Sequence, residues 1–424
     1  MNSSISNSNS NPDSGSDSNS GSEQDGSVAL NPRKAYLKIW LVALLGMAAA
    51  MLLVRLFTFA MGVKGENFLS RVFEAVHALP VMTEEKVDHV MVFGSSMVHA
   101  GFSPRQFDRE MKEKGIDIKS YNFGFGGLNP YFQDYLSRRI KENYQKNNKR
   151  VKLAILEFNP FQTTKNRFNG AKAIMDAYVG MLASEEELKE VALSDPTRGA
   201  LIYNIHYIRD NISAEMITFY FGRGLFSQER PKPEAEKDSQ EIIDRRRELG
   251  DELSTRFKQD YPDYKDEDWS LSWQGGGTIP EERSAETIAV FKEYYETLRT
   301  PYRMESDKLW RERSADITHL HFEEELVKAF IRIVKNFQQF SDQVEVILLP
   351  KNSKWIVNTP EALERQNRVL RRIEMETGIK IKDFQNIPSI TPEMFSDTTH
   401  LARYSGDIAF THALVENYAN DLKE

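Results

Sequence analysis

The sequence contains no cysteine among its 424 residues. That absence excludes disulfide bonds, thiolate metal sites and a cysteine nucleophile. The chain also lacks an excess of basic residues, because its formal net charge is −8 and its pI is about 5.7. Since nucleic-acid-binding domains carry a basic face, this charge balance argues against a nucleic acid as partner. A long apolar run occurs once, near the amino end.

The amino-terminal part divides into a polar tail and this apolar run. Residues 1–34 are rich in Ser, Asn, Gly and Asp, a composition that cannot bury enough surface to offset the entropy of ordering, so we expect a disordered tail. Residues 35–63 contain an uninterrupted apolar stretch, Ile39–Val54, which aromatic residues extend past Arg55. Because a bilayer needs about 20 such residues, we predict a single transmembrane anchor. The alternative is a cleaved signal peptide, which would release a soluble secreted esterase.

The basic residues in front of this segment favour an amino end in the cytoplasm. We therefore expect a single-pass protein of the inner membrane whose main domain lies outside the cytoplasm, on the periplasmic side.

A regular alternation of strands and helices begins at residue 85. We expect strands at 87–93, 116–123, 151–158, 344–349 and 379–384. We expect helices between and after them at 104–114, 130–147, 322–340, 360–377 and 404–422. This order predicts an α/β domain with a central parallel five-stranded sheet, formed by two halves at residues 85–160 and 321–424. Residues 161–320 are charged and lack the alternation, which predicts a large, mainly helical insertion.

A serine with a candidate base stands out in this pattern. Gly94-Ser95-Ser96 ends the first strand, and the carboxyl end of a parallel strand borders the crevice where open α/β sheets bind ligands. A serine hydroxyl needs a base to become a nucleophile, and His400 follows three residues after Asp397. We predict Ser96 as nucleophile, His400 as base and Asp397 as the carboxylate that orients the imidazole. Ser95 is predicted to shape the turn, and the structural alternative is that both serines only cap it.

Two further positions follow neighbouring strands. Gly127 closes a glycine-rich turn after the second strand, and Asn159 follows the third. Because parallel strands bring these loops to one edge of the sheet, we predict an oxyanion hole. Its donors are the backbone N–H groups of Ser96 and Gly127 and the side-chain amide of Asn159.

These segments resemble the conserved blocks of the SGNH, or GDSL-like, hydrolase superfamily. Gly94-Ser95-Ser96 is similar to the first block, with Ser where many members have Asp, and Asn122 to Gly127 is similar to the second. Asn159 stands where the third-block asparagine stands, within Glu-Phe-Asn-Pro instead of Gly-x-Asn-Asp. Asp397-Thr398-Thr399-His400 matches the final Asp-x-x-His block. The resemblance implies a three-layer, flavodoxin-like sandwich.

The first block and the predicted anchor are more similar to the membrane-anchored branch of this superfamily. That branch includes the D-alanine transfer protein of teichoic acid modification and proteins that acetylate alginate and other exported polysaccharides. The resemblance implies an O-acyltransferase or esterase without a cofactor, which transfers or removes an acetyl group on an envelope polysaccharide. It also implies a multi-spanning membrane acyltransferase as partner. The alternative is a non-catalytic envelope scaffold that docks such a partner through the insertion, although a scaffold has no need of the Ser, His and Asp residues.

Other motifs do not point to a cofactor or a metal. Gly275-Gly276-Gly277 lacks the Lys and Ser/Thr of a phosphate-binding loop. His319 and His321 have the spacing of a strand, and the acidic residues after them suit the start of a helix. Trp269 and Trp273 either stack on sugar rings or form a small core within the insertion, and the sequence leaves both open.

Overall fold

The computed structural model describes residues 32–60, 68–208, 232–260 and 284–423. The chain divides into two compact units, Met1–Gly62 and Val63–Glu424. The described part of the first unit is one helix, α1 (Pro32–Ala60). Among the residues that the structure describes, none of the helices combines the length and the hydropathy that crossing a bilayer requires. The segment predicted as an anchor, residues 35–63, runs past the described residues at its carboxyl end, and the anchor stays a prediction.

The second unit is built on a five-stranded sheet in which all neighbouring strands are parallel. Its strands are β1 (Asp88–Ser95), β2 (Ile118–Phe125), β3 (Val151–Glu157), β4 (Ser341–Leu348) and β5 (Ile381–Asp383). The order across the sheet is β2-β1-β3-β4-β5, which confirms the predicted α/β fold with a parallel five-stranded sheet. Because β2 lies on one side of β1 and β3 lies on the other, the order of the strands reverses at β1. Ligand sites of open α/β sheets lie outside the carboxyl ends of the strands at such a switch point.

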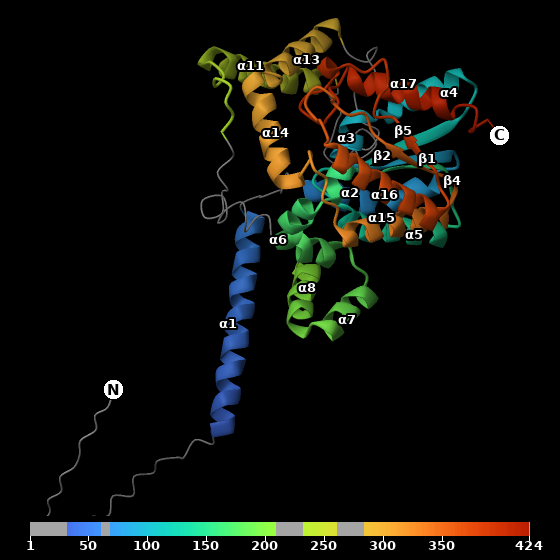
Figure 1. Ribbon diagram of the computed structural model, residues 1–424. Coiled ribbons are helices and arrows are strands. Elements are labelled where there is room, and N and C mark those ends of the chain that lie inside the picture. Colours follow the sequence, from blue (N-terminus) through green and yellow to red (C-terminus); the bar gives the residue numbers. More distant parts are fainter. Residues whose placement is uncertain (1–31, 61–67, 209–231, 261–283, 424) are drawn as a thin grey trace, which may run out of the picture. The chain divides into compact units, whose positions relative to one another are not determined.

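Helices cover both faces of this sheet (Figure 1). One face carries α2 (Phe68–Glu84), α5 (Pro130–Lys146) and α15 (Glu324–Gln338), and the other carries α4 (Pro104–Glu113) and α17 (Gly406–Tyr418). Strand β1 shows why two helical layers form. Met91 and Phe93 belong to the first core, whereas Val90 and Val92 belong to the second. Side chains alternate along a strand, so a strand that is apolar throughout needs cover on both faces.

Local signals set the ends of some helices as predicted. Helix α16 runs from Pro360 to Thr377, as the sequence indicates. The Thr359 side chain accepts the N–H of Ala362 at its start, and Gly378 adopts a φ of 75° at its end. Capping by threonine and a left-handed glycine after the last turn are the usual means of starting and ending a helix.

Two elements next to Ser96 differ from the prediction. The chain forms α3 (Ser96–Gly101) directly after β1, where a turn was expected. Strand β2 continues through Gly124 and Phe125, which were also expected in a turn. A Cβ on Gly124 would lie 2.2 Å from the backbone nitrogen of His99 in α3. Glycine is therefore required where α3 rests on β2.

Helix α2 was not predicted at all. It buries Val72, Ala75 and Leu79 in the core that α5 and α15 share, and it carries Arg71, whose side chain donates to the carbonyls of Asn122 and Gly124 at the end of β2.

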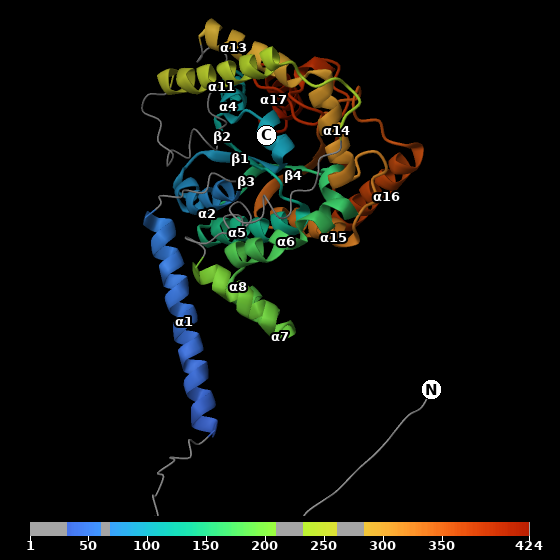
Figure 2. The same cartoon turned by 90° about the vertical axis from the view of Figure 1, so that its left-hand side faces the viewer.

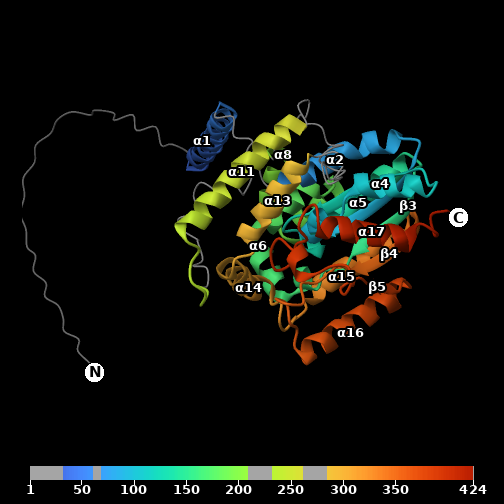
Figure 3. The ribbon, with the colours of Figure 1, turned by 90° about the horizontal axis from the view of Figure 1, so that it is seen from above.

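The region from residue 161 to 320 is mainly helical in its described parts (Figures 2 and 3). It contains α6 (Lys165–Leu182), α7 (Glu185–Ser194), α8 (Pro196–Ile208), α11 (Gln240–Asp260), α13 (Ala285–Leu298) and α14 (Pro301–Ala315). An antiparallel bridge between Thr164 and Phe322 joins its two ends. Trp269, Trp273 and the triple glycine lie outside the described residues.

Candidate active site

Ser96 is the first residue of α3, at the carboxyl end of β1. The preceding Ser95 caps this helix, because its Oγ accepts the backbone N–H of Met97 at 3.1 Å. Ser95 was predicted to shape a turn, and in the structure it caps the helix that replaces this turn. Ser95 is buried, whereas Ser96 is partly exposed and lines a cavity. Of the two hydroxyls, the structure presents that of Ser96.

The three residues predicted as nucleophile, base and orienting group lie in one hydrogen-bonded chain. His400 Nε2 is 2.7 Å from Ser96 Oγ, and His400 Nδ1 is 2.7 Å from Asp397 Oδ2. A carboxylate only accepts hydrogen bonds, so the proton of a neutral imidazole resides on Nδ1 and leaves Nε2 free to accept from the serine. The arrangement can therefore remove a proton from Ser96 Oγ and return it.

Asp397 is held as an anion by its own loop. Its Oδ1 accepts the backbone N–H groups of Thr399 and His400 at 2.7 and 2.8 Å. Burial raises the pKa of Asp397, but the nearby His400 and Arg311 outweigh it and hold that pKa below its ordinary value. The carboxylate is therefore charged at neutral pH and can accept the hydrogen bond from His400 Nδ1.

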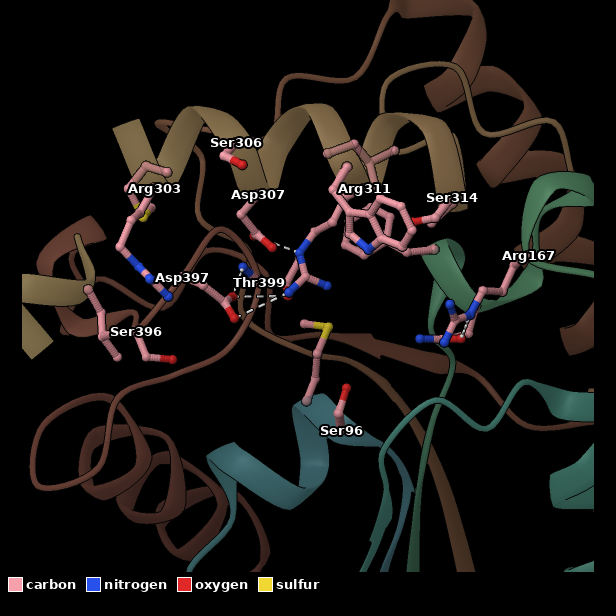
Figure 4. Close-up of a pocket in the computed structure, with 18 of the residues that line it drawn as sticks. Ser96, Arg167, Arg303, Ser306, Asp307, Arg311, Ser314, Ser396, Asp397 and Thr399 are labelled. Carbon is pink, nitrogen blue, oxygen red and sulfur yellow. Dashed lines mark hydrogen bonds and ion pairs between the residues drawn. The ribbon is translucent and has the colours of Figure 1, made fainter. Parts of the chain in front are cut away.

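Helix α14 supplies a further contact to this carboxylate, which the sequence did not predict. Arg311 donates from Nη2 to Asp397 Oδ2 at 3.2 Å and from Nε to Asp307 Oδ2 at 2.7 Å (Figure 4). Asp307 in turn accepts the backbone N–H of Thr398 at 3.2 Å and the hydroxyl of that residue. Two side chains one helical turn apart on α14 therefore fix the loop that carries Asp397 and His400.

Of the predicted oxyanion donors, Ser96 and Asn159 line the cavity, whereas Gly127 lies in a turn that borders it. Asn159 lines the same cavity as Ser96. Its Oδ1 accepts the N–H groups of Phe161 and Gln162, and its Nδ2 donates to Ser95 Oγ and to Glu157 Oε1, both at 2.9 Å. Both amide hydrogens thus have acceptors in this arrangement, and the oxyanion role of Asn159 stays a prediction.

Gly127 lies in the turn after β2 with a φ of 74°, a left-handed conformation that favours glycine. Its carbonyl oxygen accepts from Arg167 Nη2 at 3.1 Å. Arg167 lines the cavity of Ser96, so the turn borders the site, and the donor role of the Gly127 N–H stays a prediction.

A buried carboxyl group contacts Ser95, the residue that precedes Ser96. Glu157, at the end of β3, accepts the backbone N–H of Ser95 at 2.5 Å and its hydroxyl at 3.0 Å. Burial raises the pKa of Glu157 to about 7, although its hydrogen bonds to Ser95 and Asn159 lower it. On the other side of the turn, the buried side chain of Asn122 donates to the carbonyls of Val98 and Phe102 at 3.1 and 2.8 Å. Glu157 and Asn122 thus hold the two ends of α3 by hydrogen bonds.

The cavity at Ser96 has a volume of about 620 Å³. Helix α14 forms much of its wall through Tyr302, Arg303, Asp307, Trp310 and Arg311. None of these residues was singled out from the sequence, because a charged helix in an insertion gives no local sign that it faces a serine on another element.

One group of side chains has the composition of a metal site. Glu312, Asp316 and His319 offer ligand atoms that lie within 4.8 Å of one another. His319 Nδ1 is 3.3 Å from Glu312 and 3.4 Å from Asp316, and His321 Nδ1 is 2.7 Å from Asp316. These distances are those of direct contacts between carboxylate and imidazole groups, and such contacts also form in proteins without a metal ion.

A scan against protein-family models finds no match to this chain, and a search of curated proteins finds none either. The functional argument therefore depends on the geometry of the site and on the residues that form it.

Proposed function

We propose that the protein is a serine-dependent acyl-ester enzyme of the SGNH type, an esterase or an O-acyltransferase. The observation that supports it most is the chain from Ser96 Oγ through His400 to Asp397, with 2.7 Å at each step. A nucleophile in hydrogen-bond contact with a base, which is itself oriented by a third group, is the arrangement that covalent catalysis by serine needs.

The proposed reaction has two steps. Ser96 Oγ attacks an ester carbonyl while His400 Nε2 takes its proton, and His400 then gives this proton to the departing alcohol as the C–O bond breaks. The acyl group is left on Ser96. In the second step, His400 takes the proton of water or of a sugar hydroxyl, whose oxygen attacks the acyl carbonyl. His400 then returns this proton to Ser96 Oγ as the bond between Oγ and the acyl carbon breaks. Water as acceptor makes the enzyme an esterase, and a sugar hydroxyl makes it a transferase.

The proposed setting is the cell envelope. The apolar run at residues 35–63 and the resemblance to the membrane-anchored SGNH branch support an anchored protein with its catalytic domain outside the cytoplasm. The same resemblance supports an exported or envelope polysaccharide as substrate, acetyl as the acyl group and a multi-spanning acyltransferase as partner.

The test uses the full chain, purified in a non-ionic detergent. A fluorophosphonate probe reports a nucleophilic serine, and hydrolysis of p-nitrophenyl acetate reports turnover. We expect the wild-type protein to be labelled on Ser96 and to hydrolyse the ester, and both signals to be lost in Ser96→Ala and His400→Ala. Ser194→Ala, which changes an exposed serine at the end of α7, is the matched control and should keep both. A folded wild-type protein without labelling or turnover would overturn the proposal and favour the scaffold.

A further inference from the structure

The cavity beside Ser96 is positively charged in a protein that is acidic as a whole. The charged side chains of its lining are two carboxylates and four cations, namely Asp307, Asp397, Arg167, Lys232, Arg303 and Arg311. The net charge of the chain is −8. Both carboxylates are bonded to Arg311, so the other three cations are left to face the cavity. Clefts lined by one sign of charge attract ligands of the opposite sign.

Arg167 is partly buried, whereas Arg303 and Lys232 are exposed. Arg167 extends from α6 toward the cavity, and in Figure 4 Ser96 lies between it and Asp397. Its Nε donates to Gln162 Oε1 at 2.6 Å, and its Nη2 donates to the carbonyl of Gly127 at 3.1 Å. Both acceptors are neutral, and the described residues place no carboxylate within ion-pair distance of Arg167.

A guanidinium that is partly removed from water and has no carboxylate partner lowers the stability of the fold. Burial lowers the pKa of Arg167, and the positive charge of Arg311 lowers it further. An arginine that serves the fold alone is normally paired when it is buried, because an uncompensated charge is expensive. The two neutral acceptors orient the guanidinium, and its remaining N–H groups are available for an anionic group, to which arginine binds with two parallel hydrogen bonds.

The rest of the lining suits a sugar that carries such a group. Arg303 and Lys232 are exposed, and neither has a carboxylate within ion-pair distance in the part of the chain that the structure describes. Tyr302 and Trp310 line the same cavity, and aromatic rings with a polar edge are suited to contact with a ring that is apolar on one face and polar at its rim.

We infer that Arg167 binds an anionic group of the substrate, a carboxylate or a phosphate, and that the site acts on an acidic glycan. This inference rests on the proposed function, because it takes the cavity at Ser96 as the substrate site. It narrows that function by excluding neutral polysaccharides as the preferred substrate.

The experiment measures binding and needs no turnover. Full-length Ser96→Ala protein is titrated calorimetrically, at physiological salt, with three trisaccharide probes: trigalacturonate, maltotriose and maltotriose phosphate. We expect at least one anionic probe to bind about tenfold or more tightly than neutral maltotriose, and the uronate and phosphate arms distinguish the two sources of charge. Adding Arg167→Gln should reduce the affinity for that anionic probe by about 10- to 100-fold and so remove most of the preference, since one or two charge-assisted hydrogen bonds are lost.

Two further variants separate a ligand contact from a general effect of charge. Arg167→Lys keeps the charge without the paired donors and should restore part of the preference. Arg247→Gln, which removes an exposed arginine of α11, should leave the preference at its Ser96→Ala value. Equal affinity for neutral and anionic probes, or an anionic preference that survives Arg167→Gln in a folded protein, would overturn the inference. Fluorophosphonate labelling of the wild-type protein tests the proposed function separately, so the two can fail independently.

Discussion

Replacement of Arg311 by methionine tests whether helix α14 takes part in orienting Asp397 and His400. The substitution removes the guanidinium that bonds Asp397 at 3.2 Å and Asp307 at 2.7 Å, and it keeps much of the apolar length of the side chain. Asp307 then loses its cation, and Asp397 loses its contact with Arg311 but keeps its hydrogen bond with His400. If the triad is the catalytic apparatus, the change should lower kcat more than it raises KM.

The expected size follows from the contacts that remain. A hydrogen bond to a charged group contributes about 1.5–3 kcal/mol. The Oδ1 atom of Asp397 keeps its two backbone donors, and Oδ2 keeps His400, so we expect a loss near the lower end of that range. Since about 1.4 kcal/mol corresponds to tenfold in rate, kcat should fall about 10- to 30-fold. Asp397→Asn should cost far more, about 10⁴-fold, because it favours the wrong imidazole tautomer.

The assay is steady-state hydrolysis of p-nitrophenyl acetate by the full chain, with thermal unfolding of each variant in parallel. Lys308→Met is the matched control, because Lys308 lies on the same helix and is exposed. Arg311→Lys should recover part of the loss, since an ammonium group supplies charge but cannot bridge both carboxylates with a planar fork. If kcat of folded Arg311→Met stays within twofold of the wild type, or falls as far as kcat of Asp397→Asn, then Arg311 does not have the orienting role inferred from its contacts.

Two further predictions concern the residues behind the nucleophile turn. Burial raises the pKa of Glu157 from 4.5 to about 7, so the folded state binds this proton more tightly than the unfolded state. The free energy of unfolding therefore falls as the pH rises from 4.5 to 7, because the folded protein has to give up this proton. Glu157→Gln should remove a decline of up to about 3 kcal/mol in that free energy between pH 5 and pH 8, measured by urea unfolding. Parallel pH profiles of the two proteins would contradict this. In Gly124→Ala the new Cβ meets backbone atoms of His99 at 2.2 and 2.7 Å, which should displace α3 and lower kcat/KM for p-nitrophenyl acetate about 100-fold. Gly170→Ala is its control, because a Cβ there meets nothing within 4 Å, and equal activity of the two variants would refute the close-packing argument.

Much of the sheet was predictable because its signals are local. Strands β1 and β3 are apolar on both faces, a pattern that is typical of strands covered by helices on both sides of a parallel sheet. Helix α16 carries its own start and stop signals in Thr359 and Gly378. The pair Asp397 and His400 was found from sequence because the two residues belong to one short loop, and its partner Ser96 because a serine that follows a strand is visible in the pattern.

The parts that the sequence did not show depend on contacts between distant segments. Helix α3 was not predicted, since its six residues give too little periodicity to identify a helix, and its position depends on the absence of a side chain at Gly124. The engagement of the Asn159 amide by Ser95 and Glu157 depends on the pairing of β1 with β3. A motif gives the residue type at each position, but the hydrogen-bond partners are set by the fold.

The region from residue 161 to 320 also has a role that its sequence did not indicate. In the sequence it is an interruption between two halves of a sheet, and Arg303, Arg311 and Arg313 of α14 are equivalent charges on one helix. In the structure Arg311 contacts Asp397, and Arg167 of α6 lines the same cavity as Ser96. Under the proposed function, the region that selects the substrate charge is therefore also the region that orients the base. A change in how α6 and α14 pack, which the structure shows in contact, would then alter substrate preference and turnover together, whereas a change within the sheet would affect stability first.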